Sequence, residues 1–427
     1  MARINVELEE GEGVRIFGPA EVEVARGQAT ILGAELGPGD CVEIGETRSY
    51  LVKAISRASL VVRISGRARV EAPSEGEEPL DEWILTADKI VSECGRECTA
   101  VVVGPVDAGK TSVTAVLANR SLAKGVPTGV IDADVGQADI GPPGFISLSL
   151  PGSWVVWLRQ LEPVASRFVG SIEPSPAAGR IVSAIAHLRL RARAEGAAFV
   201  AVDTDGWTSG WSALEYKIDL IRGVGADAVV VVGDHDLYTF MEKSVEAPVY
   251  YVRSPGVQAV RSVEDRRRLR RENYGRFLEG GMRSISLREV KVQGACIGGS
   301  PFMDERVKGA IESQLGYSVK MMTRYPGGVC VFLDSERHVE PHEIKGGLRR
   351  MVGGELIVVS KGSVRGVLAA LVSSDGDEHP AVLEDLDLDS MTAVFKTKYE
   401  GGVVKVIFGR VKLSGDYYEE VRGRILV

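Results

Sequence analysis

The sequence is poor in the residues that build disulfide frameworks and zinc sites. Its 427 residues include five cysteines and five histidines. The cysteines are too few and too scattered for a disulfide framework. Cys94 and Cys98 stand close together, but no second Cys/His pair lies near them to complete a zinc site, so we expect ordinary buried thiols. His338 and His342 are four residues apart, yet Pro341 between them disfavours the helix that a zinc pair would need.

Long apolar runs are also missing. No stretch approaches the roughly 18 apolar residues that cross a bilayer as a helix. The first seven residues, MARINVE, alternate with charge and lack the apolar core of a secretion signal. Both absences argue against a membrane protein, and we expect the chain to reside in the cytoplasm or an equivalent reducing compartment.

The sequence has no excess of basic charge. Its 51 lysines and arginines are outnumbered by 59 aspartates and glutamates, which gives a net charge of −8. Such a protein binds nucleic acid only through a local basic patch, because its overall field repels phosphate. The remaining composition, 44% hydrophobic and 26% charged, is that of a globular protein long enough for two or three domains.

The patterns that are present divide the chain into four segments. Residues 1–70 show short alternating runs broken by turn residues, which predicts an N-terminal β domain. Residues 71–98 read as an acidic linker followed by a short helix. Residues 99–285 are expected to form an α/β domain, and residues 286–427 a C-terminal β-rich domain with a helix near 304–315.

Continuous apolar runs mark the third segment. Runs that are apolar on every side and alternate with helical stretches are typical of a parallel sheet covered on both faces. They lie at residues 100–103, 129–131, 197–202, 228–232 and 249–252. The predicted fold class is therefore α/β, a P-loop NTPase-type doubly wound and mainly parallel sheet, flanked by N- and C-terminal β-rich domains.

A phosphate-binding loop follows the first of these runs. The residues match the pattern G-x-x-x-x-G-K-[ST], between a predicted strand and a predicted helix, which is the context that the motif requires. They are Gly104, Pro105, Val106, Asp107, Ala108, Gly109, Lys110 and Thr111, followed by Ser112. Backbone N–H groups and the helix start would face a β-phosphate. Lys110 would bridge the β- and γ-phosphates, and the Thr111 hydroxyl would ligate Mg²⁺.

Carboxylates follow the second and third runs. Asp132 and Asp134 stand two residues apart at the end of a predicted parallel strand, where side chains point into the ligand crevice. One of them can hold Mg²⁺ or its water while the other accepts a proton from an attacking group. Asp203 ends the next run and is a further candidate on the magnesium side. Trp207, four residues on, can stack on a base or sugar or pack beneath its own loop.

An arginine cluster lies near the end of the third segment. Its members are Arg261, Arg266, Arg267, Arg268, Arg270 and Arg271. Helical spacing pairs Arg266 with Arg270, and Arg267 with Arg271. Arginine favours planar recognition of phosphate, and an arginine over a transferring phosphoryl group can raise the rate about 10³–10⁵-fold. The alternative is a solvated helix face.

Together these motifs resemble those of the polynucleotide 5′-hydroxyl kinases, a family that includes archaeal RNA kinases and relatives in pre-mRNA cleavage and rRNA processing. The similar segments are GPVDAGKTS (Gly104 to Ser112), DADVGQ (Asp132 to Gln137), Pro143-Gly144, the segment from Phe168 to Pro176, and the T-x-G-W "clasp" of Thr204, Asp205, Gly206 and Trp207. The R-x-x-x-R pairs within 266–271 look like the family's arginine lid, and both registers fit. The resemblance covers residues 99–278.

The resemblance implies an ATP- and Mg²⁺-dependent kinase that phosphorylates the 5′-hydroxyl end of RNA, with DNA as an open second substrate. Asp134 matches the family's acidic position best and would deprotonate the 5′-hydroxyl, while Thr111 and Asp132 would hold Mg²⁺. Lys110 and the lid arginines (Arg266, Arg267, Arg270, Arg271) would neutralise the γ-phosphate. Gln137, Thr204, Gly206 and Trp207 would hold the nucleotide or the substrate's end. The N-terminal domain would help to bind adenine.

Three alternatives stay open at this point. The chain could be a catalytically silent scaffold of an RNA-processing complex, with ATP as a structural ligand. It could be a GTPase, although the fourth run ends in Gly233-Asp234-His235-Asp236 rather than in the guanine motif N-K-x-D. It could also be a small-molecule P-loop kinase, which would leave the arginine cluster without an evident purpose. The sequence does not predict protein partners.

Overall fold

The computed structural model describes residues 2–74, 76–95, 97–256, 262–337, 339 and 346–422. The chain divides into two compact units. The first comprises Met1–Gly141, Ile146–Ala165 and Pro174–Leu269, and the second comprises Pro142–Phe145, Ser166–Glu173 and Arg270–Val427. Arg261, His338, Pro341 and His342 lie outside the described residues. No helix in the described part of the chain is both long and apolar enough to cross a membrane.

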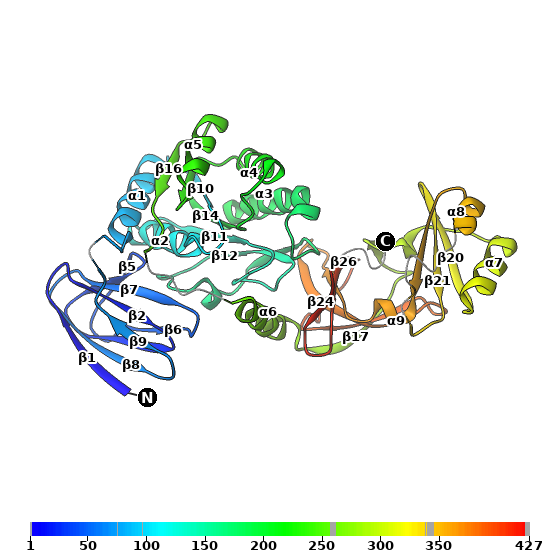
Figure 1. The fold of residues 1–427 in the computed structure, drawn as a ribbon, viewed down its shortest axis with the longest axis horizontal. Helices are drawn as coiled ribbons and strands as arrows, with labels where there is room; N and C mark the ends of the chain where they lie inside the picture. Colours follow the sequence, from blue (N-terminus) through cyan, green and yellow to red (C-terminus); the bar gives the residue numbers. More distant parts are fainter. Residues whose placement is uncertain are drawn as a thin grey trace. The chain divides into compact units, whose positions relative to one another are not determined.

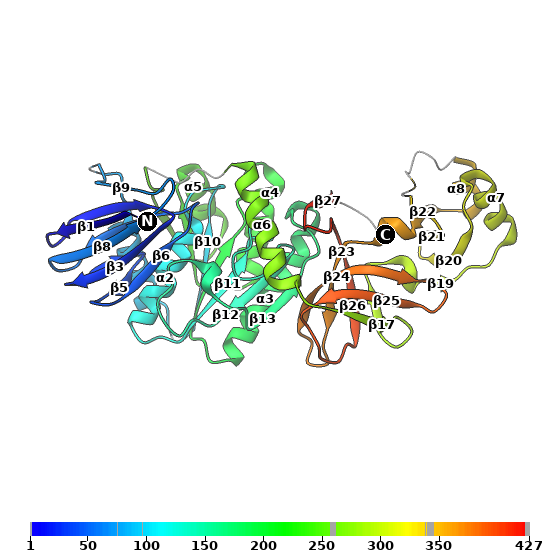
Figure 2. The same ribbon diagram turned by 90° about the horizontal axis from the view of Figure 1, so that it is seen from below.

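Two antiparallel sheets open the first unit. One has the order β1-β8-β3-β6, and these strands lie side by side in Figure 2; the other has the order β5-β4-β7-β2-β9. Their bounds are β1 Ala2–Leu8, β2 Gly13–Phe17, β3 Ala20–Arg26, β4 Ala29–Ile31, β5 Ala34–Leu36, β6 Cys41–Ile44, β7 Ser49–Ala54, β8 Ala58–Ile64 and β9 Arg69–Glu71. Alternation explains the packing, because Val22 and Val24 of β3 are fully buried while Glu23 between them is not.

A seven-stranded sheet follows, with the order β13-β12-β11-β14-β10-β15-β16. The strands are β10 Cys98–Val103, β11 Thr128–Ala133, β12 Phe145–Ser149, β13 Ala165–Phe168, β14 Phe199–Thr204, β15 Ala228–Val232 and β16 Val249–Val252. All five predicted runs form strands, and they pair in parallel with one another. β12 pairs antiparallel with β11, so the sheet is mainly parallel, as predicted.

Helices cover both faces of this sheet. They are α1 Leu80–Glu93, α2 Lys110–Ala123, α3 Ala178–Ala194, α4 Trp211–Gly223 and α5 His235–Ser244. Figure 1 shows α1 and α2 on one face and α3 and α4 on the other. Right-handed crossovers between parallel strands produce this arrangement. The predicted fold class, a doubly wound P-loop domain with flanking β-rich parts, is confirmed.

The cysteine prediction was wrong. Cys94 and Cys98 are joined by a disulfide with their Cα atoms 5.3 Å apart. The cause is a tight turn, because α1 ends at Glu93 and β10 begins at Cys98, which brings the two cysteines within the span of a disulfide. A second disulfide joins Cys296 to Cys330.

The second unit is rich in strands. Its two sheets have the orders β17-β25-β24-β23-β26-β18, with β27 paired to β26, and β19-β20-β21-β22. The bounds are β17 Gly281–Ser286, β18 Lys291–Gln293, β19 Ser300–Pro301, β20 Val319–Tyr325, β21 Gly328–Leu333, β22 Glu355–Ser360, β23 Val367–Val372, β24 Glu378–Asp387, β25 Thr392–Thr397, β26 Lys405–Leu413 and β27 Glu419–Arg422, with helices α7 Glu305–Leu315, α8 Gly346–Val352 and α9 Lys361–Val364. The helix expected near 304–315 is α7, and the Asp304 carboxylate caps it by accepting the backbone N–H groups of Arg306 and Val307.

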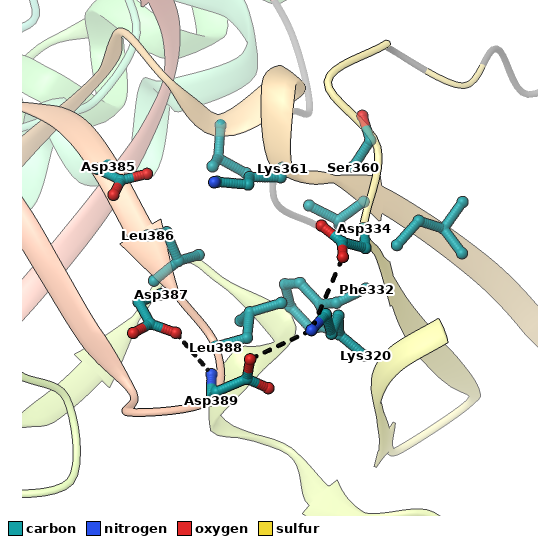
Figure 3. A pocket seen from close by; sticks show the side chains of 13 residues that line it. Lys320, Phe332, Asp334, Ser360, Lys361, Asp385, Leu386, Asp387, Leu388 and Asp389 are labelled. Atoms are coloured by element: carbon teal, nitrogen blue, oxygen red, sulfur yellow. Dashed lines mark hydrogen bonds and ion pairs between the residues drawn. The ribbon is translucent and has the colours of Figure 1, made fainter. Parts of the chain in front are cut away.

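A pocket of about 330 Å³ lies within the second unit. Figure 3 shows Lys320 in it, between the carboxylates of Asp334 and Asp389, with Nζ–Oδ2 distances of 3.7 and 3.2 Å. Its apolar wall includes Phe332 and Leu386. The pocket thus combines an apolar wall with a charged rim.

Candidate active site

The phosphate loop joins β10 to α2 with the geometry that an anion site requires. Gly109 has φ +105° and directly precedes the first residue of α2. A Cβ at Gly104 would lie 2.6 Å from the Val232 carbonyl oxygen, so only glycine fits there. Asp107 also adopts a positive φ, +61°, in the middle of the loop. The loop therefore curls at the helix N-terminus, where backbone N–H groups favour bound phosphate.

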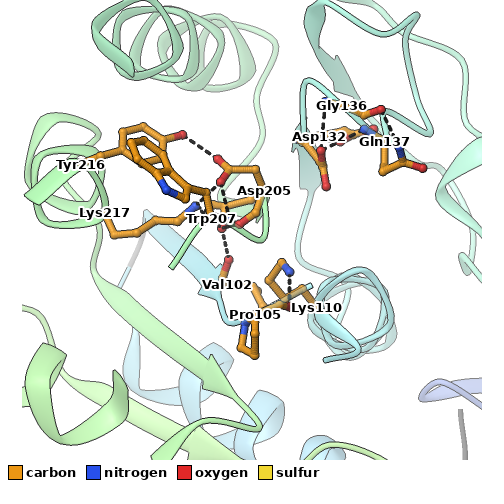
Figure 4. A network of polar contacts seen from close by, with 12 residues as sticks. Val102, Pro105, Lys110, Asp132, Gly136, Gln137, Asp205, Trp207, Tyr216 and Lys217 are labelled. Atoms are coloured by element: carbon orange, nitrogen blue, oxygen red, sulfur yellow. Dashed lines mark hydrogen bonds and ion pairs between the residues drawn. The ribbon is translucent and has the colours of Figure 1, made fainter. Parts of the chain in front are cut away.

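Lys110 and Thr111, the first two residues of α2, both have defined partners. Lys110 is buried, and its Nζ donates to the carbonyl oxygen of Pro105 at 2.8 Å, within the loop itself (Figure 4). The Thr111 hydroxyl donates to Asp203 Oδ2 at 2.7 Å. The carboxylate that meets the loop threonine is thus the one at the end of β14.

Asp203 is a buried carboxylate with one oxygen unused. Its Oδ1 has no hydrogen-bond partner in the described part of the chain, although the atom is buried. Burial raises the pKa of Asp203 to about 6, and the hydrogen bond from Thr111 opposes that rise. A buried oxygen without a partner is costly unless a ligand completes it.

Asp132 is engaged by the backbone instead. Its Oδ2 accepts the N–H groups of Asp139 and Ile140 at 2.6 and 2.9 Å, and its Oδ1 accepts the N–H of Asp134 at 3.2 Å. Burial, followed by the nearby charges of Asp203 and Asp139, raises the pKa of Asp132 well above its usual range. Both oxygens of Asp132 therefore shape the turn that follows β11.

Asp134 lies just past the end of β11, in that turn. Its Oδ1 accepts the N–H groups of Gly136 and Gln137 at 3.0 and 2.9 Å. Burial and then the charge of Asp205 raise the pKa of Asp134, while Lys110 lowers it. The carboxylate therefore has a raised proton affinity close to the loop lysine. The side chain of Gln137 turns back onto the Gly136 carbonyl at 2.8 Å.

The segment 204–207 lies against the phosphate loop. The Thr204 hydroxyl donates to the Val102 carbonyl at 2.8 Å. A Cβ at Gly206 would lie 2.6–2.8 Å from atoms of Val106, so the two backbones are in close contact. The half-buried Trp207 stacks on Tyr216, with ring centroids 5.5 Å apart and planes inclined by 26°.

The predicted lid arginines have different partners in the described structure. They lie on α6 Val263–Leu278, and the boundary between the two units falls between Leu269 and Arg270. Arg266 pairs with Asp107 of the phosphate loop, and Arg267 is exposed.

Arg270 and Arg271 have partners within the second unit. Arg270 forms an ion pair with Glu419, and both side chains are at most 10% exposed. Arg271 contacts Asp416 at 3.2 Å and lies over the Tyr418 ring at 4.0 Å. Of the four predicted arginines, Arg266 is thus the one that the described structure brings to the loop.

Two features of the site escaped the sequence reasoning. Tyr216 and Lys217 of α4 both contact Asp205, and Lys217 is fully buried. A lysine on the buried face of α4, beside Ala213 and Leu220, was the signal that could have found this contact. Arg48, in the turn between β6 and β7, forms a buried ion pair with Asp139 at 2.6 Å. No local pattern marks that pair.

Comparison with known proteins shows what this part of the chain is similar to. Residues 104–280 match the family model described as mRNA cleavage and polyadenylation factor CLP1 P-loop. A polyribonucleotide 5′-hydroxyl-kinase of Pyrococcus horikoshii is 30% identical over 55% of this chain, and the match covers 64% of that relative, which is under two thirds of its length. A relative of the same name from Thermococcus kodakarensis is 28% identical, over 59% of this chain and 72% of its own.

The fold has a solved counterpart. The structure of a wild-type Clp1p–Pcf11p complex superimposes with a TM-score of 0.62 at 13% identity, covering 96% of this chain and 98% of that one. At this identity the likeness concerns the fold. The matched region, 104–280, contains the phosphate loop, the Asp134 turn, the segment 204–207 and α6. Through that region the chain is similar to the CLP1 P-loop family and to archaeal proteins named polyribonucleotide 5′-hydroxyl-kinases.

Proposed function

We propose that the chain transfers the γ-phosphoryl group of ATP to the 5′-hydroxyl end of RNA. The observation that carries the proposal is the meeting of four side chains at the carboxyl edge of the parallel sheet. Lys110 and Thr111 come from the loop after β10, Asp134 from the turn after β11, and Asp203 from the end of β14. Positioning and charge stabilisation are what phosphoryl transfer requires of a protein.

The residues fit a nucleotide with Mg²⁺. The glycine-bounded loop at the start of α2 suits the phosphates, and the unpartnered Asp203 Oδ1 beside the Thr111 hydroxyl suits a hard cation that prefers oxygen ligands. Thr111 and Asp203 would hold the metal, which neutralises phosphate charge when bound. Asp203 is a better candidate than Asp132, because backbone N–H groups already occupy both oxygens of Asp132.

The transfer itself then assigns a role to Asp134. A bond forms between the 5′-oxygen and the γ-phosphorus, and the bond from that phosphorus to the β–γ bridging oxygen breaks. Asp134 would orient the 5′-hydroxyl and take its proton, and its raised pKa suits a general base. Lys110, released from the Pro105 carbonyl, and Arg266 would balance charge on the transferring group.

Substrate choice rests on the relatives. The archaeal relatives are named as kinases of polyribonucleotide 5′-hydroxyl ends. RNA is therefore the proposed acceptor, and DNA is tested beside it. The Clp1p–Pcf11p neighbour is a protein complex, and by analogy we propose that this chain also has a protein partner.

The test is transfer of radiolabelled γ-phosphate from ATP and Mg²⁺ to matched 5′-hydroxyl RNA and DNA oligonucleotides. Lys110→Ala should abolish transfer, while Lys243→Ala, an exposed lysine on α5, should leave it unchanged. Label on the 5′ end that survives Lys110→Ala would refute the assignment. ATP binding without any transfer by the wild-type protein would favour a nucleotide-binding scaffold.

A further inference from the structure

A closed polar network lies beneath the segment 204–207 (Figure 4). At its centre is the Asp205 carboxylate, which is only 3% exposed. Asp205 Oδ2 accepts a hydrogen bond from the Tyr216 hydroxyl at 2.7 Å, and Oδ1 accepts one from the backbone N–H of Trp207 at 2.9 Å. Lys217 Nζ lies 3.1 Å from the same Oδ1. Two neighbouring residues of α4, Tyr216 and Lys217, thus contact the Asp205 carboxylate.

Lys217 contacts three oxygen atoms here. Its Nζ donates hydrogen bonds to the Asp205 carbonyl at 2.9 Å and to the Thr204 hydroxyl at 3.3 Å. It also forms an ion pair with Asp205 Oδ1 at 3.1 Å. Lys217 therefore binds the backbone as well as the side chain of the segment, at two consecutive residues.

Stability alone does not explain such a pair. Removing two charges from water is expensive, and a buried ion pair is often no more stabilising than an apolar pair of similar volume. What a fully satisfied pair does supply is one defined geometry. The geometry held here is that of Thr204 to Trp207, next to the phosphate loop.

Residues 204–207 contact the phosphate loop, and they include the Trp207 indole, so their geometry sets the position of both. Gly206 touches Val106 of the phosphate loop so closely that no Cβ would fit. Tyr216 supports the Trp207 ring from one side by stacking. Asp205 and Lys217 also lie within electrostatic reach of Asp134, and Lys217 within reach of Lys110. The network is thus adjacent to the groups assigned to transfer without including them.

We infer that Tyr216 and Lys217 are positioning residues, which hold residues 204–207 against the phosphate loop and orient the Trp207 indole before any ligand binds. The inference predicts that the network acts through geometry, so its loss lowers turnover and frees Trp207 without removing a reacting group. The test by turnover rests on the proposed kinase function, whereas the test by tryptophan fluorescence does not.

Two variants test it. Tyr216→Phe removes one hydroxyl and keeps the ring that stacks on Trp207. Lys217→Met combined with Asp205→Asn removes both charges together, so neither is left buried and unpaired. Tyr238→Phe is the matched control, because the Tyr238 hydroxyl also bonds a carboxylate, Glu242 at 2.9 Å, but on the exposed side of α5.

The first measurement is acrylamide quenching of Trp207 emission, isolated by subtracting the spectrum of Trp207→Phe. The double variant should show stronger quenching and an emission maximum at longer wavelength. Tyr216→Phe should change both little, because the stacked ring remains. The control should match the wild type.

The second measurement separates kcat from KM in the transfer assay. Loss of a hydrogen bond to a charged group corresponds to about 10-fold, so kcat should fall by that factor in both variants while the KM for ATP stays nearly constant. Wild-type quenching and kcat in the double variant, with only the melting temperature lowered, would overturn the inference. Wild-type protein that binds ATP but transfers nothing would refute the kinase proposal, and the quenching result would still decide the role of the network.

Discussion

Thr111 and Asp203 are joined by a 2.7 Å hydrogen bond, although 92 residues separate them in the chain. The bond leaves Asp203 Oδ1 buried and without a partner in the described structure. A loop threonine and a strand-end carboxylate are thus already paired beside the phosphate loop, and under the proposed function the second carboxylate oxygen would meet the cation.

This pairing predicts the effect of Asp203→Asn. The amide keeps the size of the side chain but removes the charge that a divalent cation needs. Mg²⁺-dependent ATP affinity should fall at least about 10-fold, while metal-free ADP binding should change little. Calorimetric titration with and without Mg²⁺ measures both. Asp219→Asn, an exposed carboxylate on α4, is the control; equal Mg²⁺ dependence in both variants would contradict the assignment.

The raised pKa of Asp203 predicts a pH dependence. With a pKa of about 6 the side chain is mostly protonated below that pH in the free protein. A cation at Asp203 must then displace the proton, so Mg²⁺ binding should weaken as pH falls through about 6 and should release protons there. Calorimetry in two buffers of different ionisation enthalpy counts the protons. Asp203→Asn should remove the release at pH 5.5.

Asp134→Asn should separate chemistry from binding. Loss of a general base typically lowers the rate about 10²–10⁴-fold. The two backbone N–H bonds to Oδ1 can be kept by the amide oxygen, so the turn and ATP binding should survive. Single-turnover transfer and ATP titration measure the two effects. Full turnover in this variant would remove Asp134 from the base role.

Two arginines of one helix should behave differently. Arg266 contacts the phosphate-loop residue Asp107, so Arg266→Ala should lower transfer, by about 10³-fold if the arginine meets the transferring group. Arg270→Ala would leave the Glu419 charge buried and without its partner, so the free energy of unfolding should fall by about 3–5 kcal/mol. Transfer rates and denaturant unfolding of both variants provide the comparison. If both variants lost transfer equally and were equally stable, the result would contradict this distinction and support a common lid role for both arginines.

Gly206→Ala should disturb the phosphate loop. The added methyl would lie 2.6–2.8 Å from Val106, and overpacking of this kind costs about 1–3 kcal/mol. ATP affinity should fall about 10-fold if the loop yields. Gly179→Ala is the matched control, since a Cβ there meets nothing within 4 Å. Nucleotide titration of both variants measures the affinity for ATP. Unchanged affinity in Gly206→Ala would show that the contact between Gly206 and Val106 does not affect phosphate binding.

Much of the fold could be predicted from local pattern. Four of the strands that pair in parallel, β10, β11, β14 and β15, are buried throughout, so each contains an apolar run that is visible in the sequence. The fifth, β16, lies at the edge of the sheet and is partly buried, but it is also apolar. The phosphate loop depends on glycine conformations and a helix start, which are properties of a few consecutive residues. Strands β12 and β13, at the antiparallel end of the sheet, were not predicted, and the turn that brings Cys94 to Cys98 was also missed.

The sequence by itself determined the core strands of the sheet and the phosphate loop. Both depend on residues that are neighbours in the chain: runs of apolar residues for the strands, and glycines that allow positive φ angles for the loop. Only the tertiary structure decided that Asp203 rather than Asp132 meets Thr111, that Arg266 and Arg270 have different partners, and that Lys217 supports Asp205. These pairs, apart from Lys217 with Asp205, join residues 92 or more positions apart. Even Lys217 and Asp205 meet only because α4 folds back against the end of β14. Such contacts depend on how whole elements pack, and no local pattern specifies that.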